Sequence, residues 1–153
     1  MNVWLTRLRA RCACGCSFEA FALPPEEAKG RWVARTRSGF AAMLHEDREL
    51  LALLRRFLAE GGVPELPPLQ LVRLASLLGD PAPDGRAYDT ALGLVCPRCE
   101  AEPTELKIDK QMPEMVMALP LVQHERWFRL PQAEKRAAVL ALAEKVQPAG
   151  STA

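Results

Sequence analysis

The N-terminal part of the chain alternates apolar and polar side chains at the two-residue period of β-strands. Residues 3–11 and 17–23 carry β-branched and aromatic side chains in such an alternation, although it is imperfect in the first segment, where Trp4 lies opposite the other apolar positions. The proline pair 24–25 ends the second segment. Residues 31–37 predict either a third strand or an extended approach to the first helix.

The period then changes to the three- and four-residue spacing of helices. Apolar side chains recur in this way over 40–60, with Ser38 as the expected N-cap and the glycine pair 61–62 as the stop. A second helix is predicted over 68–78, because proline suits the first turn of a helix and Gly79 suits a left-handed end. This second helix is apolar on most sides, which predicts extensive burial.

Beyond the second helix the pattern predicts a hairpin and a final helix. Residues 90–96 are expected to form a strand and 104–109 its return, with a tight turn between them. The type of the segment around 111–120 is left open by its pattern. Pro131 is expected to open a last helix that runs to about Val146.

These elements predict an α+β fold in one domain, 1–153. Two small antiparallel ribbon halves, 3–23 and 90–109, are expected to flank a helical insertion over 38–79. A C-terminal helical segment is predicted over 111–147.

All five cysteines of the chain fall in two short clusters, RCACGCSFE (11–19) and CPRCE (96–100). Two tight turns that each offer two thiolates satisfy the tetrahedral coordination of zinc. In the first cluster Cys12 and Cys14 form the preferred pair, because Gly15 can adopt a positive φ directly after the second ligand. Cys16 competes with Cys12, since Cys14 and Cys16 have the same spacing.

The two clusters resemble the knuckles of the zinc-ribbon superfamily, which commonly read C-x-C-G or C-P-x-C-G with an aromatic residue shortly after. The matching residues are Cys12, Cys14, Gly15, Phe18, Cys96, Pro97 and Cys99. The resemblance implies one structural zinc held by Cys12, Cys14, Cys96 and Cys99. It covers about thirty residues. The sequence departs from the pattern at Glu100, where ribbons have glycine, and in the long separation between the two knuckles.

Two other chemistries of the cysteines stay open. An iron–sulfur cluster also uses four thiolates. A thiol–disulfide centre or a metal-handling protein would use Cys14, Cys16, Cys96 and Cys99 chemically, but neither cysteine cluster opens a helix after a strand, where a thiol pKa is usually lowered. A site with four cysteine ligands leaves no position for water, so zinc here predicts stabilisation and not catalysis.

Charge and composition narrow the class of protein. With 49% hydrophobic residues the chain can bury a core, and it has no run of about 18 uncharged apolar residues, which predicts no membrane span. The arginines near the start do not fit a secretory signal, and the cysteine usage fits a reducing compartment, so we expect a cytoplasmic protein. The net charge of +1 gives no general attraction to nucleic acid, although residues 1–58 carry ten Lys/Arg against six Asp/Glu.

Two surfaces are candidates for binding. Alternating arginines on the first strand share one face and are expected to contact a nucleic-acid backbone, or else to form a solvated edge; further arginines would extend this face. The candidates are Arg7, Arg9, Arg11, Arg31, Arg35 and Arg37. The stretch QHERWF offers Arg126, Trp127 and Phe128 to a protein partner, or packs its two aromatic rings on the core.

The sequence therefore predicts a non-catalytic, zinc-stabilised adaptor or subunit of a larger assembly. A nucleoprotein complex is one candidate for that assembly. A protein partner is expected, a nucleic acid is a possible second one, and a small-molecule substrate is not. The alternative is the small thiol-redox or metal-handling protein. A third interpretation is a protein-binding module that presents part of the helix at 68–78.

Overall fold

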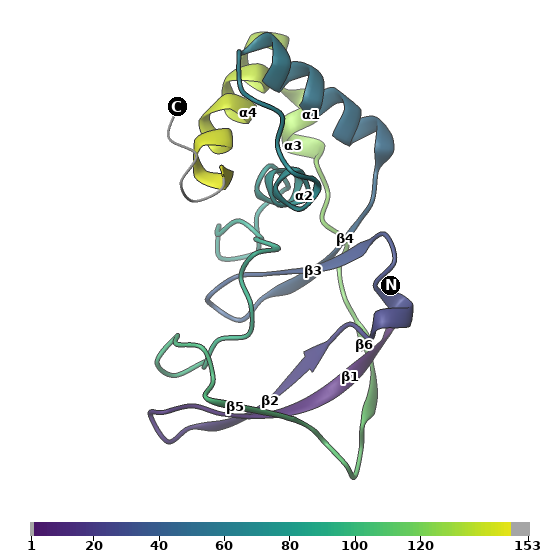
Figure 1. Cartoon of the computed structure of the whole chain (residues 1–153), viewed down its shortest axis with the longest axis vertical. Helices are drawn as coiled ribbons and strands as arrows, with labels where there is room; N and C mark the ends of the chain where they lie inside the picture. Colours follow the sequence, from purple (N-terminus) through teal and green to yellow (C-terminus); the bar gives the residue numbers. More distant parts are fainter. Residues whose placement is uncertain (1, 148–153) are drawn as a thin grey trace. The chain divides into compact units, whose positions relative to one another are not determined.

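The computed structural model describes residues 2–147, and their contacts divide the chain into two compact units. The sheet unit comprises Met1–His45 and Thr90–Leu121, and the helical unit comprises Glu46–Asp89 and Val122–Ala153. Both units are assembled from two separate stretches of chain. The fold of the described residues is α+β, as the sequence predicts, with antiparallel sheets and four α-helices, the last of which is the predicted C-terminal helix (Figure 1). The single-domain assignment for 1–153 stays a prediction.

Strand β1 (Asn2–Arg11) is the centre of the larger sheet, and all of its partners run antiparallel to it (Figure 1). β2 (Ser17–Ala22) pairs along one side. β5 (Glu105–Ile108) and β6 (Glu114–Ala118) share the other side, one at each end of β1. The ladder continues between them, because Arg7 accepts a hydrogen bond from the N–H of Asp109 at 3.0 Å and donates one to the carbonyl of Pro113 at 2.9 Å.

The imperfect alternation in β1 has a structural cause. Val3 and Leu5 are buried on one face, whereas Leu8 and Ala10 are buried on the opposite face. Each face of this strand is therefore covered at one end only. Val3 and Leu5 form a core cluster with two buried side chains from other segments, Met43 and Leu119, and with half-buried apolar side chains around them (Phe21, Leu23, Val33, Ala41, Met115 and Met117).

The predicted helix over 40–60 is wrong in its first turns. Residues Ala41–His45 form strand β4, which pairs with β3 (Arg31–Arg35) in a two-stranded sheet. A turn at Gly39, whose φ is +98°, reverses the chain, and the N–H of Thr36 donates to the carbonyl of Phe40 at 2.9 Å. The apolar residues of β4 satisfy a helical spacing as well as a strand, and pairing with β3 selects the strand. The helical insertion predicted from residue 38 therefore begins later.

Two further predictions of the sequence are wrong in the sheet unit. Residues 90–96, predicted as the strand that pairs with 104–109, lie in no strand, and the return segment, β5, pairs with β1 instead. The helical segment predicted over 111–147 begins with strand β6. The alternation of that strand places Met115 and Met117 against the core cluster, in register with β1. A short 3₁₀ helix, Pro25–Glu27, follows β2.

The helical unit contains α1 (Arg48–Glu60), α2 (Pro68–Leu77), α3 (Glu125–Arg129) and α4 (Gln132–Val146). Each helix buries its apolar side chains against the other helices of this unit. The buried side chains of α1, α2, α3 and α4 include Leu54, Phe57, Leu71, Leu74, Trp127, Val139 and Ala143. No helix among residues 2–147 is long and apolar enough to cross a membrane.

At two glycines of the helical unit, Gly61 and Gly79, a neighbouring side chain lies too close to the backbone for a Cβ atom. A side chain at Gly61 would overlap the δ carbons of Leu140 in α4, and Gly62 has a φ of +74°, so the predicted stop after α1 is confirmed. The left-handed conformation predicted for Gly79 is wrong. That glycine is required because a Cβ there would overlap a methyl group of Val122, which packs against the end of α2.

The N-cap of α1 gives a first testable prediction. Asp47, not Ser38, caps this helix: its Oδ1 accepts a hydrogen bond from the N–H of Leu50 at 3.1 Å. We expect Asp47→Ala to lower the free energy of unfolding by about 1 kcal/mol, because one N–H at the helix start loses its partner. Chemical denaturation would measure the change. Asp47→Asn retains the accepting oxygen and should cost much less; an equal loss for both variants would contradict the capping role.

Candidate metal centre

The candidate site lies where two turns of the sheet unit meet. The first turn joins β1 to β2 and carries Cys12 and Cys14. It is closed by hydrogen bonds from the N–H of Gly15 to the carbonyl of Cys12 and from the N–H of Cys12 to that of Cys16, both at 2.9 Å. Gly15 adopts a φ of +90°, as the sequence predicts. The β1–β2 register, which ends at the pair Arg11 and Ser17, thus places both cysteines at the tip of a hairpin.

The second turn precedes β5 and carries Cys96 and Cys99. The N–H of Glu100 donates to the carbonyl of Cys96 at 2.8 Å, and the N–H of Cys96 donates to the carbonyl of Ala101 at 2.8 Å. The backbone N–H of Arg98 points at the sulfur of Cys96, at 3.4 Å. Both turns therefore fold their chain so that two thiols leave on the same side.

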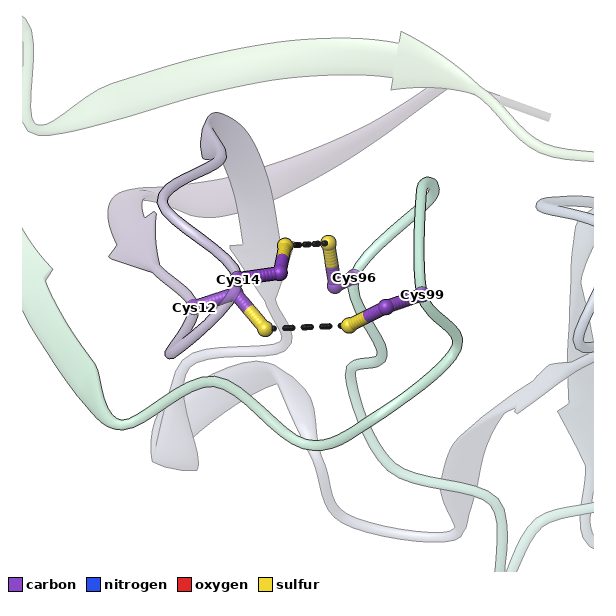
Figure 2. Close-up of side chains that lie close together, drawn as sticks. All are labelled: Cys12, Cys14, Cys96 and Cys99. Atoms are coloured by element: carbon purple, nitrogen blue, oxygen red, sulfur yellow. Dashed lines mark hydrogen bonds between the residues drawn. The ribbon is translucent and has the colours of Figure 1, made fainter.

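The four thiols of these turns converge on one point (Figure 2). Their sulfur atoms all lie within 4.8 Å of one another. The sulfur of Cys12 is 3.2 Å from that of Cys99, and the sulfur of Cys14 is 3.7 Å from that of Cys96. Each close pair joins the two turns, so the arrangement connects segments more than eighty residues apart in the sequence.

These distances fit a tetrahedral ion bound by four sulfurs. With metal–sulfur bonds of about 2.3 Å, the edge of such a tetrahedron is about 3.8 Å. One sulfur pair is near this value and the other is shorter, so binding of an ion at the centre requires only a small separation of Cys12 and Cys99. The donor set consists of soft ligands, which suit zinc or iron–sulfur centres better than magnesium or calcium.

The environment of Cys96 favours the thiolate that a metal requires. The side chains of Cys12 and Cys96 are buried, whereas Cys14 and Cys99 are exposed. The backbone N–H groups of Cys99 and Arg98 donate toward the Cys96 sulfur and lower the pKa of this thiol to about 6. A buried thiolate that accepts backbone hydrogen bonds is the usual state of a structural metal ligand.

The structure places the fifth cysteine outside the group. Cys16 is half-buried, and its thiol contacts the carbonyl of Ser17 at 3.8 Å. Among residues 2–147, the sulfurs that meet within ligand distance are those of Cys12, Cys14, Cys96 and Cys99, the set that the zinc-ribbon resemblance implies. Phe18, the aromatic residue of the first knuckle, is half-buried on β2 opposite Ala10.

The second turn shows the conformation of Glu100, the residue that stands where zinc-ribbon knuckles commonly have glycine. Glu100 has a φ of +61° and is the one non-glycine residue with positive φ in the described part of the chain. This is the position at which zinc-ribbon knuckles commonly carry glycine. A side chain in the left-handed region costs about 1 kcal/mol or more, so the turn holds Glu100 in an unfavourable conformation.

A second testable prediction follows from the two turns. We expect Glu100→Gly to raise the free energy of unfolding by about 0.5–1 kcal/mol, since glycine removes the left-handed cost but adds some freedom to the unfolded chain. Gly15→Ala should have the opposite sign and about 1 kcal/mol, because no atom lies near its added methyl group and only the backbone conformation is penalised. Urea denaturation measures the free energy of unfolding of both variants. A loss of stability in Glu100→Gly would contradict the unfavourable left-handed conformation of Glu100.

The structure gives four of the six candidate arginines partners within the sheet unit. Arg7 pairs with Glu19 at 3.3 Å, and Arg31 pairs with Glu27 at 3.4 Å. The guanidinium of Arg35 donates to the carbonyl of Phe21 at 2.7 Å and lies over the ring of the same residue. Arg35 therefore joins β3 to the free edge of β2, and burial lowers the pKa of its guanidinium.

Arg9 has a partner that the sequence does not indicate. Its Nε donates to the carboxylate of Asp109 at 3.2 Å. The Asp109 side chain is buried and also accepts the N–H groups of Met112 and Gln111, which with Arg9 lower the pKa of this carboxyl. Arg11 and Arg37 are the candidate arginines that remain exposed without an ion-pair partner among the described residues. The six arginines consequently do not form one uniform basic face.

The candidate partner patch is divided between core and surface. Trp127 is 3% exposed, and its ring meets that of Phe57 edge-on with centroids 6.1 Å apart. Trp127 therefore packs on the core of the helical unit, and partner binding by Arg126, Trp127 and Phe128 stays a prediction. Arg126 and Phe128 on the same short helix are exposed. The helix α2 is likewise mostly buried, and Leu69 near its start is its exposed large apolar side chain.

Comparison of the chain with protein-family models, curated proteins and solved structures finds no match. The functional argument therefore depends on the geometry of the four thiols and of the surfaces around them.

Proposed function

We propose that this chain is a non-catalytic subunit or adaptor of a larger assembly, stabilised by one structural zinc in a centre of the zinc-ribbon kind. The single observation that carries the proposal is the convergence of Cys12, Cys14, Cys96 and Cys99 within 4.8 Å. Zinc is favoured among soft metals because both pairs of ligands sit on tight turns of a small β-structure, which is the usual setting of structural zinc.

The proposed role of the ion is mechanical. Four protein sulfurs fill a tetrahedral coordination sphere, so the zinc would have no site for water or substrate. Bound there, it would tie the β1–β2 hairpin to the turn that precedes β5. Such a link removes much of the conformational freedom of the unfolded chain, which supports a small sheet unit whose β1 is covered at one end of each face.

The adaptor role is supported by apolar side chains left exposed on the sheet unit. Trp4 and Val116 form an exposed cross-strand pair, and Leu106 and Ile108 on β5 are also exposed. Exposed apolar groups of this size are typical of protein-binding surfaces. A protein partner therefore fits the surface better than a polyanion does, because Glu19 and Asp109 already pair with two of the arginines on β1.

Elemental analysis and native mass spectrometry of the purified chain test the proposed centre. We expect one zinc per chain and slow reaction of four thiols with a thiol reagent until a chelator removes the metal. A protein that contains iron and sulfide, or that is metal-free with reactive thiols, would overturn the proposal.

A metal-free protein with reactive thiols would favour the alternative, a thiol-redox or metal-handling protein. The observation that favours this alternative is the short distance between sulfurs of opposite turns, 3.2 Å for Cys12 and Cys99. A redox centre should form a disulfide reversibly, without loss of the fold, on exposure to an oxidised glutathione buffer.

Binding of a nucleic-acid backbone by the arginines stays a proposal with its own test. Replacing Arg11 and Arg37 by alanine removes the two candidates that have no ion-pair partner among the described residues and leaves the ion pairs of the fold intact. If the arginines bind phosphate, this variant should bind a random-sequence oligonucleotide more weakly and with a smaller salt dependence than the parent chain. Fluorescence anisotropy at two salt concentrations measures both, and unchanged binding would remove the arginines from the proposal.

A further inference from the structure

Strand β5 presents a free edge. It pairs with β1 on one side, and no described strand pairs with its other side. The N–H of Asp109 donates to the carbonyl of Arg7 in β1, so the backbone of Asp109 faces β1. In an antiparallel ladder every second residue faces the same neighbour. Ile108 and Leu106, which do not, therefore direct their backbone N–H and C=O groups away from β1. An edge with unpaired backbone groups is a template for another strand.

The side chains of this edge are apolar on one face of the sheet. Leu106 and Ile108 are 48% and 57% exposed. Their register partners on β1 are the even-numbered residues Ala10 and Leu8, so the two side chains lie on the same face as Trp4 and its cross-strand neighbour Val116. The edge therefore combines unpaired backbone groups with exposed apolar side chains on one face of the sheet.

The opposite face of β5 carries two charges in a self-complementary order. Glu105 and Lys107 flank Leu106, and neither has an ion-pair partner among the described residues. A two-fold axis at Leu106 would place Glu105 of one copy opposite Lys107 of the other, twice by symmetry. The same axis opposes the outward backbone groups of the two Leu106 residues, which is the pairing that an antiparallel ladder requires.

We propose that β5 is a homodimer interface, in which the β5 edges of two copies pair antiparallel about Leu106 and join their sheets. The choice of a second copy as the occupant rests on charge. A strand that complements this edge carries a lysine opposite Glu105, an apolar residue opposite Leu106 and a glutamate opposite Lys107. In an antiparallel pairing about Leu106, β5 of a second copy supplies these three residues.

The apolar face contributes to the same pairing. Leu106 of each copy would meet its symmetry mate, and Ile108 would extend the apolar contact beside it. Because the strand has four residues, the interface is small, and a dissociation constant in the micromolar range is expected. The proposal does not depend on the metal centre, since neither the cysteine turns nor any thiol takes part.

Charge reversal tests both the dimer and its register. Glu105→Lys and Lys107→Glu each oppose like charges across the axis and should raise the dimer dissociation constant by about tenfold or more, measured by sedimentation equilibrium. The double variant Glu105→Lys/Lys107→Glu restores opposite charges and should recover the parent constant. A mixture of the two single variants should form a heterodimer, because every cross-axis pair is then complementary.

Controls separate this test from effects on folding or net charge. Glu65→Lys makes the same charge change as Glu105→Lys at an exposed site of the helical unit and should leave the dimer unchanged. Far-ultraviolet circular dichroism and metal content confirm that each variant is folded. A parent chain that is monomeric up to about 100 µM, or a dimer that Glu105→Lys and Lys107→Glu both leave unchanged, would overturn the proposal. The monomer result would leave the edge to a strand from a different protein.

Discussion

The Cys96→Ser variant is expected to lose the zinc proposed for the four-thiol centre and, with it, the stability of the sheet unit. Cys96 is the most deeply buried of the four thiols, with no exposed surface, and backbone N–H groups of its own turn direct hydrogen bonds at its sulfur. A serine hydroxyl at that position is a poor zinc ligand and leaves a buried polar group beside three thiols. Structural zinc contributes about 10–16 kcal/mol of apparent binding free energy in small zinc domains, so loss of one ligand should remove several kcal/mol.

Zinc content and denaturant unfolding, measured on the same samples, would check this expectation. The matched control is Cys16→Ser, which replaces a cysteine of the same hairpin whose sulfur lies outside the group of four. We expect that variant to keep one zinc per chain and to unfold within about 0.5 kcal/mol of the parent, as surface substitutions usually do. If Cys16→Ser loses zinc and Cys96→Ser keeps it, the ligand set is a different one. A chelator should destabilise the parent chain as Cys96→Ser does, and it should have little further effect on Cys96→Ser itself.

The cysteine centre was predictable because it depends on local chemistry. The positive φ of Gly15 follows from glycine's conformational freedom, and it is this turn that brings Cys12 and Cys14 to the same side. The convergence of the two distant turns followed only from the requirement of four ligands for one ion. The departure at Glu100 was visible in the sequence, but its energetic meaning needed the observed φ.

The elements that the sequence misassigned are those that tertiary pairing decides. Residues 41–45 and 114–118 carry apolar side chains that suit either a helix or a strand, and they become strands because β3 and β1 offer them hydrogen-bonding edges. Residues 90–96 suit a strand by composition, but their predicted partner, β5, pairs with β1 instead. By contrast, α2 and α4 were predictable, since proline and a long apolar pattern determine a helix locally.

Surfaces were less predictable than elements for a related reason. The arginines of β1 alternate as the sequence indicates, but their partners come from other segments: Glu19 across the hairpin and Asp109 one hundred residues away. A row of like charges in the sequence therefore becomes a mixed surface in the fold. The exposed edge of β5 was invisible for the same reason, because an edge is defined by which strands fail to pair.

Trp127 gives the second large effect expected from substitution. Its indole is buried in the helical unit, meets the ring of Phe57 edge-on, and donates a hydrogen bond from Nε1 to the carbonyl of Lys135 at 3.2 Å. Trp127→Ala should lower the free energy of unfolding by about 3–5 kcal/mol, because it leaves a large cavity and removes the hydrogen bond of the indole N–H. Trp127→Phe retains most of the apolar volume and should cost less, with the lost hydrogen bond as the main remaining term.

Phe128 is the matched control, since it is the next residue of the same short helix and is 48% exposed. Its ring contacts that of Trp127 with centroids 5.0 Å apart, so Phe128→Ala should cost about 1 kcal/mol or less, the size of one aromatic pair at the surface. Urea denaturation followed by circular dichroism compares the two variants without relying on tryptophan fluorescence. Equal and small losses for Trp127→Ala and Phe128→Ala would mean that the indole is not part of the core, and would restore the pair as a candidate binding surface. A large loss confined to Trp127→Ala assigns the ring to packing and leaves Arg126 and Phe128 as the exposed part of that helix.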